Sequence, residues 1–535
     1  MSKEKPPHRA LVLQGGGAIG AYEAGVFKVL YFWIKKDIRN KNENIFDVVA
    51  GTSIGAINGA ILVSYVQEKG TWEGAPERLS KFWEYISSTP DLSNWWPFWF
   101  NWPYPWSENS WMKVWDERHT INPSAATGEA ARRFYSTKEY ILSGAPKVFS
   151  KEKIVYDNKF FNDFPSIPNN TWFRYDNRPL KESIKQYAKF PIATSFDKKQ
   201  PRLIIITVDV EEAEIVAFDS YVKKDGHRNS EYGYDEKKKE YIQKMEYDDG
   251  LMAEHIIASA SVPVHYDYAF VPIKYDYTKS EEEKETKLKE DLQQDNLKSH
   301  RRFWDGGILS NTPLRELIQV HQDYWKEVED AENVPDLEVY VIDVWPWMEK
   351  GKYPISSDYD SVINRKNELT YQDKTPYDEK VANIVSDYYD LANVLLDLAR
   401  KKGATNTDLN EILTRQTKSA HRTGEKRRYH DLLDKRFDIT KLIRIERSGD
   451  TDDISNKWCD FSSDTISKLF KQGMDDALQS LAKYAKEHNK KNIQVAYDQL
   501  NTFINEINSQ KSGQDSYNHY LIEAAKKAML QLPDL

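Results

Sequence analysis

Apolar and polar positions follow one repeating order over the first 66 residues of the chain. The run Ala10 to Gln14 is apolar on both faces, which is typical of a buried strand, and three glycines, Gly15 to Gly17, end it. Apolar residues then recur at helical spacing from Ala18 to Ile34. The order repeats with a strand at Phe46 to Ala50 and a helix at Ile54 to Val66. It predicts an α/β fold, a three-layer sandwich with helices on both faces of a mainly parallel sheet.

The pattern is less regular farther along the chain. It predicts helices at 76–87, 128–142, 180–189 and 253–260, and strands at 203–209, 214–218, 268–273, 302–304 and 337–344. The run 279–299 is almost entirely charged and amide side chains, which indicates a solvated surface insertion. From about Tyr377 the pattern is mainly helical, with one more strand at 441–445.

Composition narrows the class of protein. The 535 residues are 40% hydrophobic, enough for a sizeable core and for one large domain or two ordinary ones. The net charge of -9 gives no reason to expect nucleic acid as a partner. The longest apolar stretch, around 54–66, is too short to cross a bilayer. One cysteine allows no intrachain disulfide, and the first residues show no signal peptide. We therefore expect a cytoplasmic protein, with peripheral contact to a membrane surface left open.

The second predicted turn contains a serine between glycines, in the order Gly51-Thr52-Ser53-Ile54-Gly55. A G-x-S-x-G sequence between a strand and a helix is typical of a nucleophile elbow, whose sharp turn exposes the serine hydroxyl. Glycine is needed on both sides because the turn leaves almost no space beside the nucleophile. The alternative is a tight strand-to-helix turn that happens to contain a serine.

The first glycine-rich turn, Gly15-Gly16-Gly17-Ala18-Ile19-Gly20, allows two interpretations. Its backbone N–H groups can hold an oxyanion, or the turn can belong to a dinucleotide site. A dinucleotide site requires an acidic residue at the end of the next strand. The only nearby acid, Asp47, is at the beginning of that strand, and no Gly-Lys-Ser/Thr follows for a Walker site.

A third motif, Asp305-Gly306-Gly307, follows the predicted strand 302–304. Strand ends at one edge of a parallel sheet share a crevice, so Ser53 and Asp305 can meet there, although Asp-Gly-Gly is often only a turn. No histidine after Asp305 is followed by a glycine turn at a strand end. A serine–aspartate dyad needs no histidine, provided that the aspartate is shielded from water and its basicity is raised.

Three stretches of the sequence resemble, in this order, the motifs of the patatin-like phospholipases, a family of acyl hydrolases. They are QGGGAIGAYEAGV, VVAGTSIGAINGA and WDGGILSNTP. The stretch HIIASASVPVHYDY at 255–268 resembles the segment between the family's elbow and its aspartate. The resemblance implies a catalytic domain at about 8–345 and a mostly helical region at 346–535. It further implies that Ser53 is the nucleophile and Asp305 the base, and that amides of Gly15, Gly16 and Gly17 form the oxyanion hole.

The resemblance implies that the protein hydrolyses a carboxylic ester of a lipid, as a phospholipase A or a lysophospholipase does. It implies no cofactor. No His, Cys, Asp and Glu set has metal-ligand spacing, so we expect no metal. The alternatives are a catalytically silent lipid-binding or scaffold protein and a nucleotide-binding protein. The oligomeric state and the identity of the lipid stay open.

Two stretches outside these motifs have unusual composition. Residues 95–111, WWPFWFNWPYPWSENSW, are too rich in proline and aromatics for a regular helix. They can line an acyl pocket, lie at a membrane interface or pack under a loop. The basic stretch 422–436 is typical of a solvated helix face, and it can also attract anionic lipid headgroups.

Overall fold

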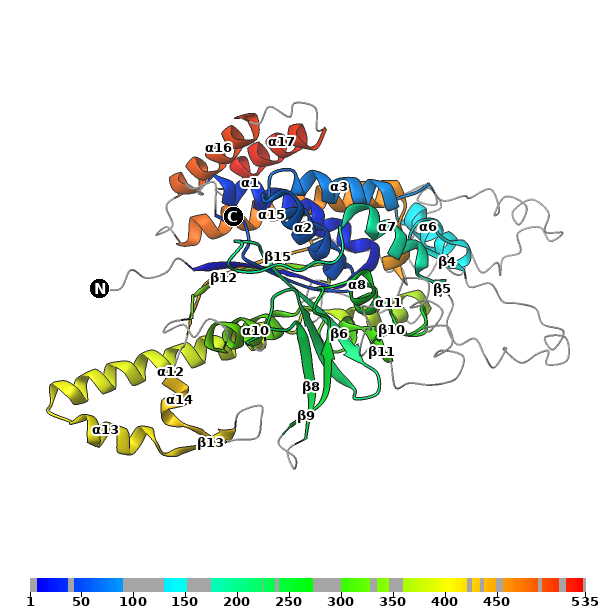
Figure 1. Cartoon of the computed structure of the whole chain (residues 1–535). Coiled ribbons are helices and arrows are strands. Elements are labelled where there is room, and N and C mark those ends of the chain that lie inside the picture. Colours follow the sequence, from blue (N-terminus) through cyan, green and yellow to red (C-terminus); the bar gives the residue numbers. More distant parts are fainter. Residues whose placement is uncertain are drawn as a thin grey trace, which may run out of the picture.

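The computed structural model describes most of the chain (Figure 1). The described residues are 7–36, 43–89, 129–151, 175–224, 226–235, 240–272, 300–327, 334–345, 359–420, 426–433, 437–448, 456–488, 493–509 and 516–532. The predicted insertion at 279–299 and the aromatic stretch at 95–111 lie outside them.

In the described part of the chain, eight strands form one central sheet. The strands are, in spatial order, β10 (Ala269–Pro272), β11 (His300–Asp305), β6 (Arg202–Asp209), β2 (Val48–Thr52), β1 (His8–Leu13), β12 (Leu337–Asp343) and β15 (Ile439–Glu446), with β7 (Glu214–Asp219) paired to β6. Five of them, β6, β2, β1, β12 and β15, run parallel to one another. By contrast, β7, β11 and β10 join by antiparallel pairing, so the sheet is mixed but mostly parallel.

Helices cover both faces of this sheet, as the sequence pattern predicts (Figure 1). The described helices are α1 (Ala21–Lys35), α2 (Ile54–Lys69), α3 (Ala75–Ile86), α6 (Glu129–Ser143), α7 (Arg178–Tyr187), α8 (Ala253–Ser259), α10 (Leu314–Glu327), α11 (Tyr359–Tyr371), α12 (Pro376–Lys401), α13 (Asn406–Leu413), α14 (Tyr429–Leu433), α15 (Ser463–His488), α16 (Ile493–Ser509) and α17 (Ser516–Gln531). Short 3₁₀ helices are η1 (Gly17–Gly20), η5 (Gly306–Ile308) and η6 (Lys457–Cys459). The expected α/β sandwich with a helical C-terminal region is confirmed.

The alternation of side chains along the strands divides the core in two. On β1, Leu11 and Leu13 point toward the side covered by α1, α2 and α3, while Ala10 and Val12 point toward α10 on the other side. Both sets are fully buried. Because the parallel strands are covered on both faces, they are continuous apolar runs in the sequence.

The C-terminal region contributes to the same sheet and core. Strand β15 pairs with β12 in parallel, and α15 packs along α1. Every α1 residue except the last, Lys35, is buried, because the helix lies between the sheet and α15. The division of the chain at residue 345 stays a prediction.

Several details differ from the sequence prediction. The helix expected at 18–34 begins as the 3₁₀ turn η1, which is followed by α1. The sequence pattern missed two antiparallel hairpins, β8 (Asn229–Asp235) with β9 (Glu240–Glu246), and β13 (Gln416–Ala420) with β14 (Lys426–Arg428). It also missed the small sheet β3 (Gly144–Ala145), β4 (Phe149–Lys151) and β5 (Tyr175–Asp176). The described part of the basic stretch 422–436 is β14 and α14, so it is not one helix face.

The helices of the described residues show no candidate membrane span: none combines enough length with enough apolar character.

Candidate active site

Ser53 is the residue between β2 and α2, where the chain reverses sharply. Its φ of 56° and ψ of -122° lie in a region that non-glycine residues rarely adopt, which costs on the order of 1–3 kcal/mol. The residue precedes the first turn of α2, where backbone N–H groups and the helix dipole favour negative charge. Its side chain is 8% exposed. This strained strand-to-helix turn has the geometry expected of a nucleophile elbow.

The two glycines of the elbow are required by close backbone contacts. A Cβ atom on Gly51 would lie 2.4 Å from the carbonyl oxygen of Gly55, and one on Gly55 would lie 2.5 Å from the carbonyl oxygen of Leu13. Neither backbone can move away, because both belong to the core of the sheet and α2. The elbow therefore fits only with glycine at both positions.

This crowding makes a testable prediction about stability. We expect Gly55→Ala to lower the free energy of unfolding by at least about 1–3 kcal/mol, since a buried backbone must shift. Gly59→Ala on the same helix is the matched control, because its Cβ would meet only side-chain methyl groups, at 3.1 Å and 3.2 Å. Thermal denaturation of the two variants measures the difference. Equal melting temperatures would contradict the packing argument.

Asp305 lies beside Ser53 because the C-terminal ends of strands β2 and β11 meet along β6. Thr52, the last residue of β2, lies opposite Ile206, and Asp305, the last residue of β11, lies opposite the next residue, Thr207. Strand β2 runs parallel to β6 and β11 runs antiparallel to it, so their C-terminal ends meet. The sequence pattern predicts this meeting at one edge of a parallel sheet, but in the structure the antiparallel strand β11 carries Asp305 to Ser53.

The Ser53 hydroxyl donates a hydrogen bond to Asp305, with 2.5 Å between Oγ and Oδ2. The other carboxyl oxygen, Oδ1, accepts from the Gly307 N–H at 2.7 Å. Burial raises the pKa of Asp305 to about 7, although both hydrogen bonds act to lower it. An aspartate with a pKa near 7 is a far better proton acceptor than an exposed one.

Ser259, at the end of α8, is a site residue that the sequence argument did not single out. Its hydroxyl accepts from the Ser53 N–H at 2.8 Å and donates to the Ile206 carbonyl at 2.6 Å. Two residues later, the Ser261 carbonyl accepts from the Asp305 N–H at 2.9 Å. This segment thus holds the backbones of Ser53 and Asp305 together. The available signal was the resemblance of 255–268 to a family segment, which gave no role to either serine.

The glycine-rich loop lies directly beside Ser53. A Cβ atom on Gly15 would be 3.0 Å from the Ser53 Cβ. The Gly15 carbonyl accepts from Trp345 Nε1 at 3.0 Å and from Asn311 Nδ2 at 3.2 Å. The Gly15 N–H donates to the Asn311 carbonyl at 3.2 Å. No acceptor for the Gly16 or Gly17 N–H is found within the described residues.

Buried amide side chains hold this loop in place. Gln14 Oε1 accepts from the N–H groups of Val344 and Trp345 at 2.7 Å and 2.8 Å, and its Nε2 donates to Thr312 Oγ1 at 2.9 Å. Asn311 Nδ2 also donates to the carbonyl of Tyr371, the last residue of α11, at 2.7 Å. The site is therefore braced by residues on both sides of the predicted boundary at 345.

Within the described residues, no hydrogen bond joins a histidine to the side chain of Ser53 or Asp305. His321 is buried, with its Nε2 2.8 Å from the Pro335 carbonyl, and burial lowers its pKa to about 3. Its ring lies near that of His8, at the start of β1, which is the opposite end of the sheet from Ser53. His430 and His488 lie exposed on α14 and α15, and His421 is outside the described residues. The group that contacts Ser53 Oγ is the Asp305 carboxylate.

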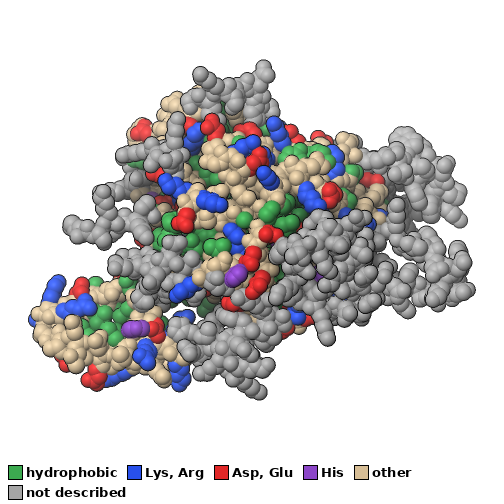
Figure 2. Space-filling model, viewed as in Figure 1, with side chains coloured by type: hydrophobic (Ala, Val, Ile, Leu, Met, Phe, Trp, Pro, Cys, Tyr) green, Lys and Arg blue, Asp and Glu red, His purple; other side chains and the backbone are tan. Residues whose placement is uncertain are grey.

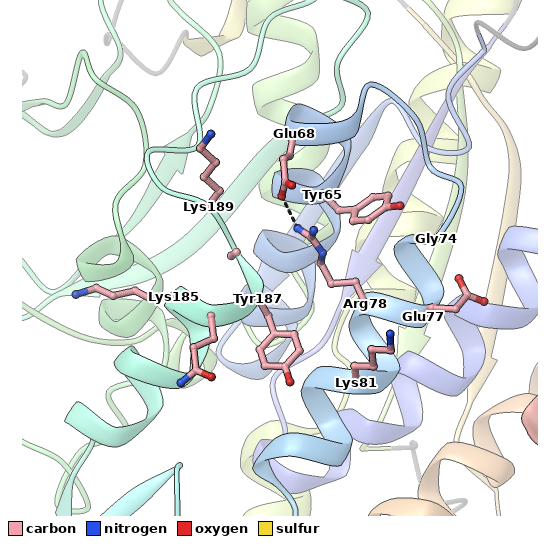
Figure 3. A pocket seen from close by; sticks show the side chains of 11 residues that line it. Tyr65, Glu68, Gly74, Glu77, Arg78, Lys81, Lys185, Tyr187 and Lys189 are labelled. Carbon is pink, nitrogen blue, oxygen red and sulfur yellow. Dashed lines mark hydrogen bonds and ion pairs between the residues drawn. The ribbon is translucent and has the colours of Figure 1, made fainter. Parts of the chain in front are cut away.

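Two further features bear on ligands. A groove of about 680 Å³ lies between α2, α3 and α7, and Figure 3 shows Arg78 and Glu68 paired inside it. Its wall also carries Glu77 and three lysines, and it includes neither Ser53 nor Asp305. An acyl pocket needs an apolar wall, so this groove does not fit an acyl chain. Within the described residues, no group of three or more His, Cys, Asp and Glu is placed to hold a metal ion.

Comparison with known proteins identifies the family of this chain. The family model described as patatin-like phospholipase matches residues 11–318, which is more than half of the chain. No curated protein matches. Among solved structures, the chain is similar to VipD from Legionella pneumophila, with 11% identity over 99% of this chain and 86% of that one and a TM-score of 0.24. The family model therefore identifies the chain: it belongs to the patatin-like phospholipase family of lipid acyl hydrolases.

Proposed function

We propose that this protein hydrolyses a carboxylic ester of a lipid with Ser53 as nucleophile and Asp305 as general base. The observation that supports this most strongly is the hydrogen bond of 2.5 Å from Ser53 Oγ to a buried carboxylate whose pKa is about 7. A serine in a strained elbow has no structural need for such a partner. Membership of a lipid hydrolase family supports the substrate class.

The reaction proceeds in two halves. The Asp305 carboxylate takes the hydroxyl proton as Ser53 Oγ attacks the ester carbonyl carbon, which gives a tetrahedral intermediate. The intermediate collapses, the alcohol leaves with the proton from Asp305, and the acyl group stays on Ser53. A water molecule then attacks the acyl-enzyme and gives its proton to Asp305. Release of the fatty acid restores the Ser53 hydroxyl.

The oxyanion of each tetrahedral intermediate needs N–H donors beside Ser53. Gly15, Gly16 and Gly17 are the candidates from the family resemblance, but the Gly15 N–H already donates to the Asn311 carbonyl. We therefore assign the donor role to Gly16 and Gly17. Gly15 contributes by its lack of a side chain, since it allows the loop to lie against Ser53. One such donor is worth on the order of 10²–10³ in kcat.

The raised pKa of Asp305 predicts the pH dependence of the reaction. Only the carboxylate can accept the proton, and its pKa of about 7 means that the acid form dominates below that pH. We expect kcat/KM to rise from pH 5 and to reach half its plateau near pH 7. The measurement is a pH–rate profile with an ester that does not ionise in this range. A profile that is flat from pH 5 to 8 would exclude Asp305 as the base.

The decisive first experiment is labelling with a fluorophosphonate probe, which reacts with activated serines. Wild type and Ser53→Ala are labelled, and the modified residue is mapped by mass spectrometry. Modification at Ser53 that is absent from the variant supports the proposal. If Ser53 does not react even with lipid vesicles present, the hydrolase proposal fails. The silent lipid-binding alternative then becomes the better explanation.

A further inference from the structure

Helices α12 to α14 and the hairpin β13–β14 form an arm that projects from the body of the protein (Figure 1). The first turn of α12 is tied to the body by Arg444 of β15, which pairs with Asp373 and contacts Glu379 at 3.2 Å. None of the 26 residues of α12 is buried. Figure 2 shows hydrophobic side chains gathered on the arm. A soluble helix of this length normally buries an apolar face against something.

Nine large apolar side chains of α12 are exposed, and all but Val385 and Val394 follow a heptad order. Seven of them alternate at spacings of four and three, and each is between 40% and 72% exposed: Tyr377, Val381, Ile384, Tyr388, Leu391, Leu395 and Leu398. This spacing of 3.5 residues is that of the a and d positions of a coiled coil. We call these seven residues the α12 seam.

The seam faces away from the rest of the arm. The half-buried positions of α12 are Asp378, Glu379, Ala382, Ser386, Tyr389, Ala392, Asn393, Leu396 and Ala399. At 100° per residue, the centre of this set lies about 130° around the helix from the centre of the seam. The arm therefore packs on one side of α12 and leaves the seam without a partner within the described residues.

We propose that the α12 seam pairs with the α12 seam of a second copy of this chain, as a parallel two-stranded coiled coil. A heptad helix is complementary to another helix of the same register, and the chain supplies one itself. Four tyrosine rings at about 150 Å² each contribute on the order of 600 Å² of buried surface. Ten aliphatic side chains, five from each copy, raise this above the roughly 1,000 Å² that a specific interface needs.

The charges beside the seam favour this partner and this direction. In a parallel pair, Lys380 faces Val385 of the second copy and Asp387 faces Ala392, so no like charges meet. An antiparallel pair would bring Lys380 against Lys401. A membrane surface fits less well, because α12 carries five Asp or Glu against three Lys or Arg, whereas interfacial helices are rich in Lys and Arg.

The oligomeric state of the full chain tests the proposal. Sedimentation equilibrium of the wild type should give a mass of twice 62.5 kDa. Ile384→Glu should weaken the dimer at least tenfold, while the adjacent off-seam variant Asn383→Glu should change its Kd less than twofold. Both side chains are exposed in the single chain, so both variants should keep the wild-type circular dichroism and melting curve. A monomeric wild type at about 100 μM, or a dimer that Ile384→Glu leaves intact, would overturn the proposal, even if α12 is then found to bind vesicles or another protein.

Cysteine cross-linking tests the direction of pairing. In a parallel pair, position 398 meets itself, whereas in an antiparallel pair it meets position 381. Leu398→Cys should therefore give a disulfide-linked dimer on mild oxidation, and Asn383→Cys should not. The one native cysteine, Cys459, is buried and does not compete. Absence of the Leu398→Cys cross-link would rule out the parallel pair.

Discussion

Replacement of Ser53 by alanine should abolish ester hydrolysis and leave the fold intact. The hydroxyl supplies the atom that bonds to the acyl carbon, and no other group can replace it. Loss of the nucleophile of a serine hydrolase lowers kcat by on the order of 10⁶-fold. The structure predicts little change in stability, because alanine keeps the Ser53 N–H bond to Ser259 and tolerates the same backbone angles about as poorly as serine does.

The measurement compares kcat on a lipid ester with the melting temperature of the same preparation. Ser87→Ala is the matched control, because it removes a hydroxyl from a half-buried serine after α3, at the opposite end of that helix from its start at Ala75. We expect wild-type activity in the control. Activity of Ser53→Ala within tenfold of the wild type would mean that another residue is the nucleophile.

Replacement of Asp305 by asparagine should lower the activity and, at higher pH, raise the stability relative to the wild type. Asparagine keeps an oxygen that can accept from the Gly307 N–H, but it cannot take the Ser53 proton. Loss of a general base costs about 10²–10⁴-fold in rate. We expect a decrease of this size in kcat at pH 8.

The stability of the Asp305→Asn variant should change in the opposite direction. The folded-state pKa of about 7 lies above the reference value of 3.8, so the folded chain holds the proton more tightly than the unfolded chain. The stability that protonated Asp305 contributes is complete below about pH 4 and is lost as the pH rises through about 7. The total difference is roughly 4 kcal/mol, at about 1.4 kcal/mol per pKa unit.

Asparagine carries no charge at any of these pH values, so the variant avoids this loss. The melting temperature of Asp305→Asn should therefore rise relative to that of the wild type as the pH increases from 5 to 8. Exposed Asp197→Asn is the control and should show no such trend. Near-normal activity in Asp305→Asn, or a melting temperature that falls further below the wild type at higher pH, would contradict the assignment.

The local motifs of the site were predictable from the sequence because each depends on short-range geometry. A strand, a glycine turn and a helix specify the elbow around Ser53, and the same order specifies the loop Gly15 to Gly17. Hydrophobic periodicity likewise located β1, β2, β6, β12, α1 and α2 to within a few residues. These elements are buried on both faces or along one side, so their apolar pattern is strong.

The sequence pattern could not show which groups meet across the fold. Asp305 contacts Ser53 because β11 is antiparallel to β6 and ends one residue beyond β2, a register that no local pattern encodes. Ser259, Asn311 and Tyr371 reach the site through hydrogen bonds to residues distant in the chain. The engagement of the Gly15 N–H by Asn311 depends on the same packing.

By itself, the sequence determined the α/β class, the sharp serine turn between two glycines and the glycine-rich loop. These follow from residue types at fixed short spacings, which act through sterics and hydrogen bonding within one turn. Only the tertiary structure decided that Asp305 is the partner of Ser53, that its burial raises its pKa to about 7, and that the C-terminal region completes the sheet and braces the site. The physical reason is that burial and strand register are properties of the whole packed chain, since desolvation of one carboxyl depends on every element that covers it.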